Sequence, residues 1–391
     1  MTKPNNIWIL TALFISVFTI GTSEYVIMGI LPVIATDLSI TIPTAGLLVT
    51  GYALGVALGS PLITAMTSQS SRKKLLVGLM IFFILSNVLA AVSFNFELLM
   101  IARILSSLIH GTFFAVATVV ASKTAPQDKQ GSAIAAVAAG LTLSTVLGVP
   151  FGTFVGHTWG WQTTFWIVTF LGIAAVIMLI LHIPSRIKFQ YQSLKYELGA
   201  FKNPQIILVL LITVFGYGGI FASYTYIAPQ LETFAGFSAE AITILLFLFG
   251  IGSFLGTVVA GKFANRLLMP TLSITLVLLT VILALFTWTV HDKILSSITV
   301  FLFGFTAFAT VPLLQTKIVQ TAKEAPTLAA AANISAFNLA NAVGAYLGGE
   351  TIRTGFGMPI VNLTGAVITA AGVIFSIILI VYGRKHRVKQ K

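Results

Sequence analysis

The sequence has no cysteine, and charged residues make up only 8% of its 391 residues. The lack of cysteine excludes disulfide bonds and thiolate metal sites. The lack of charge excludes an ordinary soluble protein, because a soluble domain carries about 25% charged residues to cover its surface. Hydrophobic residues make up 57% of the chain, which is too many for a disordered protein or a repeat array. The alternating segments of about 10 residues that are typical of a membrane β-barrel do not occur either. The composition therefore predicts a helical membrane protein.

Twelve apolar segments run along the chain, and each is long enough for a membrane-spanning helix, which needs roughly 20 apolar residues. They cover residues 7–33, 46–66, 75–93, 98–121, 131–156, 161–183, 204–228, 239–263, 271–290, 294–316, 327–350 and 358–382. We therefore predict an all-α membrane protein with twelve transmembrane helices. Pro32 is expected to end the first helix and Pro229 the seventh.

The longest connection, between Pro184 and Pro204, separates six segments from six. The two halves resemble each other at the prolines named above and at two pairs of glycines, Gly148 with Gly344 and Gly152 with Gly348. Six helices per half give both halves the same orientation in the membrane, as in a transporter built from parallel repeats. We predict a six-helix bundle in residues 1–185, a cytoplasmic linker in 186–203 and a second six-helix bundle in 204–391.

The net charge of +12 follows the membrane topology. If the N-terminus lies inside, all 22 lysines and arginines except Arg103, Lys293 and Arg353 fall on the inner side. Such an excess is typical of cytoplasmic loops, which face anionic lipid. The charge therefore predicts that both termini are cytoplasmic, and it gives no support to a nucleic-acid partner.

Three short motifs complete the pattern. The second segment is followed by Thr67-Ser68-Gln69 and then Arg72-Lys73-Lys74, the eighth ends in Gly261 and leads to Asn265 and Arg266, and the fifth contains Gly148-Val149-Pro150-Phe151-Gly152. Together they resemble the major facilitator superfamily, within it the drug/proton antiporter group, and most closely the bacterial sugar (arabinose-type) efflux transporters. Ser68 and Gln69 depart from the superfamily, which has Asp and Arg there.

This resemblance covers essentially the whole chain, and it implies the superfamily's fold of two pseudo-symmetric bundles. It implies a transporter in the bacterial inner membrane that works as a monomer, with a small-molecule substrate and protons as partners and with no cofactor or metal. The motif residues would act in gating, and the glycine–proline motif is typical of exporters. Spans 1, 4, 7 and 10 would line the central cavity.

Apart from tyrosines, three ionisable residues lie well inside the predicted spans, away from the ends. Glu24 in the first span would cost at least about 2.5 kcal/mol if it faced lipid, so it must face a cavity or a partner. Arg103 in the fourth span lies at a comparable depth, and we predict that the two pair. His110 lies two turns further along on the same face as Arg103. These residues either couple protons to transport or only lock helices together; for His110, the alternatives are a proton relay and a simple hydrogen bond.

Candidate substrate contacts are aromatic and amide residues, because rings stack on flat ligands and amides both donate and accept hydrogen bonds. They are Tyr52, Tyr217, Phe221, Tyr224, Gln315, Asn338 and Asn341. Packing and interhelical hydrogen bonding are the alternative roles for these residues.

We therefore predict a proton-coupled exporter of sugars or related small molecules that works by alternating access. The alternatives are a multidrug or nucleobase exporter and a proton symporter that imports its substrate. Metalloprotease, hydrolase and nucleotide-binding motifs are missing from the sequence, which argues against an enzyme.

Overall fold

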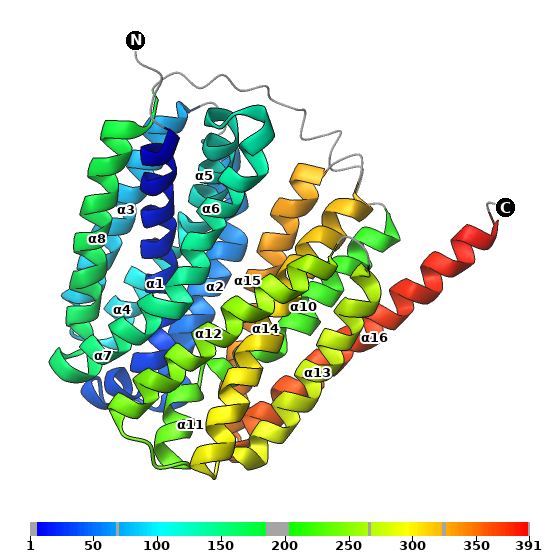
Figure 1. The fold of residues 1–391 in the computed structure, drawn as a ribbon. Helices are drawn as coiled ribbons and strands as arrows, with labels where there is room; N and C mark the ends of the chain where they lie inside the picture. Colours follow the sequence, from blue (N-terminus) through cyan, green and yellow to red (C-terminus); the bar gives the residue numbers. More distant parts are fainter. Residues whose placement is uncertain (1–5, 68–69, 185–202, 265–266, 323–325, 390–391) are drawn as a thin grey trace. The chain divides into compact units, whose positions relative to one another are not determined.

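A computed structural model describes residues 6–67, 70–184, 203–264, 267–322 and 326–389. In these residues every regular element is a helix, and twelve stretches are long and apolar enough to cross a membrane. The predicted all-α architecture with twelve transmembrane segments is therefore confirmed. Figure 1 follows the helices along the chain.

The first six spans contain nine elements, because the fourth and fifth are interrupted. They are α1 (Asn6–Asp37), α2 (Ile42–Met66), α3 (Arg72–Ala91), α4 (Phe96–Leu108), α5 (His110–Thr124), α6 (Gln130–Leu143), the π-helical turn η2 (Ser144–Gly148), α7 (Val149–Trp159) and α8 (Trp161–His182). A short 3₁₀ turn, η1 (Gln127–Lys129), precedes α6.

The other six spans are mostly unbroken. The elements are α10 (Pro204–Tyr224), the short α11 (Ile227–Thr233), α12 (Ala239–Phe263), α13 (Leu268–Thr289), α14 (Lys293–Thr321), α15 (Pro326–Arg353) and α16 (Ile360–Lys389). The described helices form two compact units. The first comprises α1 to α8 and the first turns of α12 (Ala239–Phe247), and the second comprises α10, α11, the remainder of α12 and α13 to α16.

Neither proline ends its span as predicted. α1 continues through Pro32 to Asp37, because a proline this close to a helix end removes only one of the last hydrogen bonds. α10 already ends at Tyr224, and Pro229 lies within the separate helix α11.

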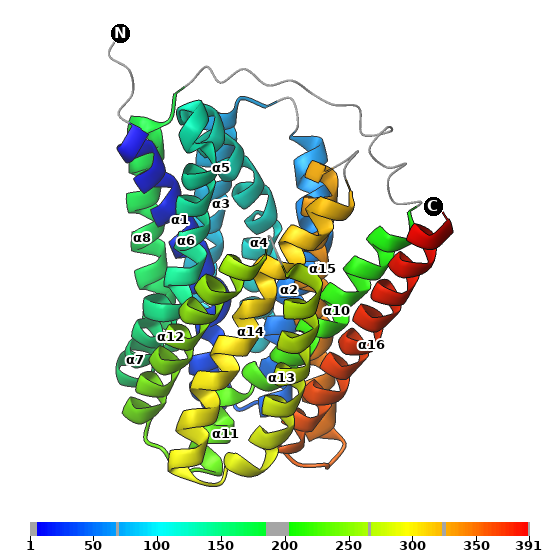
Figure 2. The same cartoon turned by 45° about the vertical axis from the view of Figure 1, so that its right-hand side comes forward.

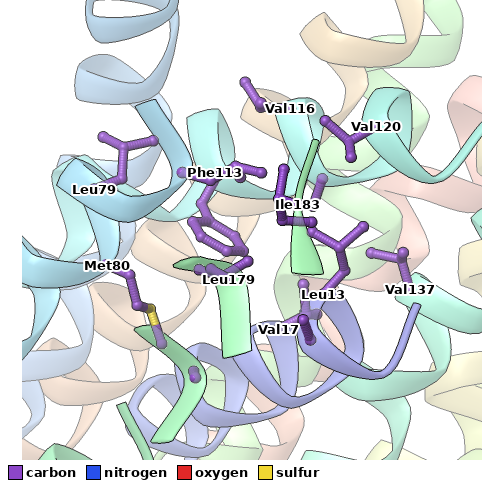
Figure 3. Close-up of a cluster of buried hydrophobic side chains, with 14 of the residues drawn as sticks. Leu13, Val17, Leu79, Met80, Phe113, Val116, Val120, Val137, Leu179 and Ile183 are labelled. Carbon is purple, nitrogen blue, oxygen red and sulfur yellow. The ribbon is translucent and has the colours of Figure 1, made fainter. Parts of the chain in front are cut away.

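In the first unit, α1 packs against α2, α5, α6, α7 and α8 (Figure 1). Figure 3 shows part of an apolar cluster of this unit, in which Leu13 and Val17 from α1 lie among side chains of α3, α5, α6 and α8. Phe113 of α5 lies in the same cluster and is fully buried. α1 is therefore the central helix of this unit.

In the second unit, α10 takes the corresponding place and packs against α14, α15 and α16; Figure 2 shows α10 and α16 side by side. The helix contacts repeat between the units. In the first, Gly148 lies against Thr22 and Gly152 against Val26; in the second, the matching pairs are Gly344 with Gly218 and Gly348 with Ala222. From the first unit to the second, both residues of each contact shift by the same number of positions along the chain. The contacts therefore repeat, and not only the glycines.

Candidate functional site

The Glu24 side chain is buried inside the first unit, with only 5% of the residue exposed. Its carboxylate oxygen Oε2 lies 3.5 Å from Nδ1 of His110 on α5. The carboxylate therefore faces a polar partner inside the bundle, as the cost of exposing an acid to lipid requires.

Arg103 reaches the same segment of α1 in a different way from the predicted pair. Its Nη1 donates to the Ser23 carbonyl oxygen at 2.6 Å, and its Nη2 donates to the Glu24 carbonyl oxygen at 3.3 Å. The described side chains of Glu24 and Arg103 form no ion pair within 4.0 Å. The depth of the two residues predicted that they meet, but the direction in which each side chain leaves its helix sets the contact, so the predicted carboxylate–guanidinium pair was wrong in this detail.

His110 is presented at an interruption between two helices, since α4 ends at Leu108 and α5 begins at His110. The backbone N–H of Gly111 donates to Oγ of Ser60 on α2 at 3.1 Å, and the Thr112 hydroxyl donates to the Ser60 carbonyl at 3.0 Å. Serine hydroxyls that bond to the preceding turn, as Ser106 and Ser107 do, also favour a bend. These polar contacts to α2 hold the break and place the imidazole against Glu24.

Tyr52 lies beside Arg103 and His110 in the first unit and not with the aromatic residues of the second unit. Its hydroxyl lies 3.3 Å from His110 Nδ1, and the Arg103 guanidinium lies 4.2 Å from the centre of its ring. Only 1% of Tyr52 is exposed. We refer to Glu24, Tyr52, Arg103 and His110 as the Glu24 cluster.

Sequence reasoning missed Ser23, which provides the main acceptor for Arg103. Its hydroxyl donates to Oδ1 of Asn87 on α3 at 2.9 Å, and the Asn87 amide donates to the Phe83 carbonyl. The available signal was the run of small and polar residues that precedes Glu24 in an otherwise apolar span. Ser23 and Asn87 connect the Glu24 cluster to α3.

A second polar and aromatic group lies in the second unit, on α10 and its neighbours. Tyr217 packs edge-on against Phe337 of α15, with ring centres 4.8 Å apart, and its ring also meets Phe221. Tyr224 stacks on Phe249 of α12 at 4.3 Å. The predicted aromatic residues of this span therefore lie together and are buried.

Some side-chain amides of the second unit are hydrogen-bonded to each other, whereas others have an oxygen without a partner. Gln315 accepts from the Asn333 amide at 2.9 Å, and Asn333 in turn accepts from the Thr213 hydroxyl at 2.7 Å. In contrast, the buried Oδ1 atoms of Asn338 and Asn341 have no hydrogen-bond partner among the described residues, and neither does the Tyr224 hydroxyl. Gln315 thus joins α14 to α15, whereas the oxygens of Asn338, Asn341 and Tyr224 are buried and unpaired, which calls for an explanation.

A further network, which the sequence did not predict, joins three helices of this unit. The Asn362 amide donates to Gln230 at 2.7 Å, and Asn362 accepts from the Ser223 hydroxyl at 2.6 Å. All three residues are fully buried, so this network ties α10, α11 and α16 together. Among the described residues, no group of three or more His, Asp or Glu side chains is arranged to hold a metal ion.

The profile of the Major Facilitator Superfamily matches residues 13–345 of the chain. The chain belongs to this superfamily. It is 42% identical to an uncharacterised MFS-type transporter of Bacillus subtilis, YfhI, over 96% of this chain and 94% of that protein. It is 40% identical to the inner membrane transport protein YdhP of Escherichia coli K12, over 92% of each. A chloramphenicol resistance protein of Streptomyces lividans is 33% identical, over 87% of this chain and 88% of that protein.

The fold is that of a solved transporter as well. A bacterial homologue of the human lysosomal transporter Spinster, in an inward-facing and occupied conformation, superimposes with a TM-score of 0.78 and 17% sequence identity. The match covers 97% of both chains. Membership of the superfamily and the relatives named above make the protein a multi-pass membrane transporter and not an enzyme.

The glycine–proline motif of this transporter begins at Gly148, the last residue of the π-helical turn η2, and continues into the start of α7. Pro150 has no N–H to continue the regular helical bonding, and the wider turn directly before it accommodates this loss. Gly148 and Gly152 lie against Thr22 and Val26, on either side of Glu24 in α1. The close packing of this face is therefore confirmed, and a role in the direction of transport stays a prediction.

The structure describes only part of the two motifs that follow the second and eighth spans. Arg72 begins α3, Lys74 is exposed, and Lys73 Nζ donates to the Ile180 carbonyl oxygen in the last turn of α8. Gly261 has open space around its Cα, while Asn265 and Arg266 lie outside the described residues. The contact of Lys73 is expected to stabilise α8, because cations stabilise helix C-termini.

Proposed function

We propose that this transporter exports small molecules from the bacterial cytoplasm in exchange for protons, by alternating access of its two six-helix halves. The observation that carries the proposal is the buried Glu24 carboxylate beside His110 in the first unit. An ionisable acid inside a membrane span is expensive, and such residues commonly belong to proton or substrate pathways. The similarity to a chloramphenicol resistance protein supports export.

The proton would bind at the carboxylate of Glu24. Oε2 of Glu24 is buried and has no hydrogen bond among the described residues, so a proton placed there meets no competing donor. Arg103 is held by the backbone carbonyls of α1 and not by the carboxylate, so a change in the charge of Glu24 breaks no hydrogen bond to Arg103. Glu24 would take up a proton when it is accessible from outside and release it when it is accessible from the cytoplasm.

The substrate would be a neutral small molecule that carries a ring and hydrogen-bond donors. In the second unit, Tyr217 and Tyr224 supply ring faces, and the Oδ1 atoms of Asn338 and Asn341 supply unused acceptors. No lysine, arginine, aspartate or glutamate lies in the middle of the described spans of this unit. Sugars and related molecules satisfy this description, because aromatic rings stack on sugar rings and amides bind their hydroxyls.

An amphipathic drug is the second candidate substrate. The cluster of Tyr217, Phe221, Phe308 and Phe337 is rich in ring surface, and the related protein of Streptomyces lividans is named for resistance to chloramphenicol. Thermal stabilisation of the purified transporter by a panel of sugars, drugs and purines would identify the class. Replacing Tyr224 by Leu should weaken the affinity for the correct ligand about 5- to 150-fold, since one stacked ring contributes about 1–3 kcal/mol. An unchanged affinity would remove Tyr224 from the substrate site.

Proton coupling is tested in proteoliposomes that carry the Glu24→Gln variant. We expect pH-gradient-driven transport to be lost while exchange of internal for external substrate without a gradient continues. Glu97→Gln is the matched control, because Glu97 is an exposed acid in the first turn of α4. Full gradient-driven transport by Glu24→Gln would refute the role of Glu24.

The direction of coupling is tested by the sign of the gradient. An antiporter accumulates substrate inside the vesicle when the interior is acidic, whereas a symporter does so when the exterior is acidic. Accumulation only with an acidic exterior would overturn the proposal of export.

The orientation is tested by labelling with a membrane-impermeant thiol reagent, because the chain has no cysteine of its own. A cysteine in place of the exposed His291 should react in intact cells, and a cysteine in place of the exposed Ser70 should react only after the membrane is opened. The reverse pattern would place the termini outside.

A further inference from the structure

Two oxygen atoms compete for one nitrogen of His110. The Tyr52 hydroxyl lies 3.3 Å from Nδ1, and the Glu24 carboxylate oxygen Oε2 lies 3.5 Å from the same atom. A neutral imidazole nitrogen carries either a hydrogen or a lone pair, so Nδ1 either donates or accepts at any moment. An ionised carboxylate can only accept from Nδ1, whereas the Tyr52 hydroxyl can accept from it or donate to it, so the charge of Glu24 decides which form of the histidine is favoured.

An ionised Glu24 can only accept a hydrogen bond, so it favours a hydrogen on Nδ1. In that form the Tyr52 hydroxyl cannot donate to Nδ1 and can only compete with the carboxylate for its hydrogen. Once Glu24 binds a proton, its need for a donor falls, the hydrogen can move to Nε2, and the Tyr52 hydroxyl can donate to Nδ1. In the structure Tyr52 and His110 are hydrogen-bonded through Nδ1 while Glu24 Oε2 has no hydrogen bond within the described chain, as the second arrangement requires.

The position of the Tyr52 hydroxyl is set by Arg103. The guanidinium lies 4.2 Å from the centre of the Tyr52 ring, and the backbone carbonyls of Ser23 and Glu24 hold the guanidinium in turn. A planar guanidinium both stacks on a ring and donates in its own plane, so it can make these contacts together. The ring is thus fixed between Arg103 and His110, and the hydroxyl has little freedom to follow another partner.

We propose that Tyr52 is a positioning residue of the proton site: its hydroxyl stabilises the form in which Glu24 carries the proton, by donating to Nδ1 of His110. The inference rests on the proposed proton coupling through Glu24. The ionisable groups here are Glu24 and its neighbour Tyr25 on α1, Tyr52 on α2, Arg103 on α4 and His110 on α5. α3 and α6 also pack on α5; α6 has no ionisable side chain, and those of α3 lie in its first turn, Arg72 to Lys74.

The experiment compares Tyr52→Phe with the unchanged protein in proteoliposomes, with gradient-driven transport measured as a function of pH. Phenylalanine keeps the ring under Arg103 and removes only the hydroxyl. Losing the hydrogen bond between Tyr52 and His110, which accompanies the protonated form of Glu24, should weaken proton binding about 2- to 10-fold, which moves the midpoint of the pH profile about 0.3 to 1 unit toward acid. The maximal rate should be retained.

Two further variants separate positioning from packing. Tyr52→Leu removes the ring as well, so it should lower the maximal rate and the thermal stability in addition to moving the midpoint. Tyr346→Phe is the matched control, since Tyr346 on α15 is 47% exposed, and its profile should superimpose on that of the unchanged protein. A second readout is the nitrogen chemical shift of His110, which reports the tautomer and should switch with pH in the unchanged protein and lose the Nε2–H form in Tyr52→Phe.

The outcomes distinguish this inference from the proposed function. If Glu24→Gln keeps gradient-driven transport, proton coupling through Glu24 fails and the inference fails with it. If Glu24→Gln loses that transport while Tyr52→Phe keeps the midpoint and the His110 tautomer unchanged, only the role of Tyr52 is overturned.

Discussion

A methyl group on Gly344 tests how closely the central helices of the second unit approach each other. A Cβ atom at this position would lie inside 3.0 Å of the Gly218 carbonyl oxygen and at 3.0 Å from the backbone nitrogen of Ala222. Both neighbours are backbone atoms and cannot rotate away. Gly344→Ala must therefore push α15 away from α10.

The expected loss follows from two opposing effects. Overpacking a close contact costs about 1–3 kcal/mol, and replacing glycine by alanine inside a helix returns about 0.8–1 kcal/mol. Because the contact is with backbone, we take the upper part of the first range and expect Gly344→Ala to lose about 1–2 kcal/mol of stability.

Gly148→Ala, the matching change in the first unit, should behave differently. Its added methyl would meet the side chain of Thr22, so the obstacle can be removed by a second substitution. Thr22→Ala deletes the hydroxyl and methyl of that side chain and should recover about 1 kcal/mol of the loss. No single side-chain change offers the same rescue for Gly344→Ala.

The assay is thermal unfolding of the purified variants in detergent, with the double-mutant cycle of Gly148 and Thr22 run in parallel. Gly78→Ala on α3 is the control, because no atom lies within 4 Å of its added methyl. Equal melting temperatures for Gly344→Ala and Gly78→Ala would refute the close approach of α10 and α15. Additive effects of Gly148→Ala and Thr22→Ala would refute the contact in the first unit.

Three other substitutions test contacts of the first unit by the same measurement. Arg103→Lys should lose about 1–3 kcal/mol, because an ammonium cannot bond to two carbonyls and stack on a ring at once; full stability would contradict those contacts. Lys73→Gln should cost about 0.3–1 kcal/mol, as expected for losing a cation at the end of α8, and a larger loss would show another role. Asp37→Asn should cost about 1 kcal/mol, because the carboxylate accepts from Nε1 of Trp161 at 2.7 Å; a stability gain would rule that bond out as stabilising.

The number of the spans and their approximate positions were predictable from sequence because hydropathy is a local property. The backbone N–H and C=O groups of each apolar run form hydrogen bonds within their own helix, so the run can cross the membrane whatever its neighbours are. The glycine pairs of the fifth and eleventh spans were visible for a related reason, since only small residues allow such close packing. Glu24 was identifiable because a lone acid in an apolar span has to be buried in protein.

The contacts within the site could not be predicted from the sequence, because they depend on how the helices pack in the folded chain. α1 is apolar on nearly all sides, so its sequence does not state which way Glu24 points around the helix axis. The break before His110 depends on Ser60, which is remote in sequence, and it turns the imidazole toward Glu24. Arg103 consequently bonds to the backbone of α1 although its depth predicted a bond to the carboxylate.

By itself, the sequence determined the membrane location, the twelve helices, the repeated halves and the few polar residues that need an explanation inside the bilayer. Only the tertiary structure decided how those residues pair. Tyr52 is hydrogen-bonded to His110 in the Glu24 cluster, and Gln315 is hydrogen-bonded to Asn333. The reason is physical. Burial is dictated by composition along the chain, whereas a hydrogen bond depends on the rotation and register of two helices, and packing between distant segments sets both.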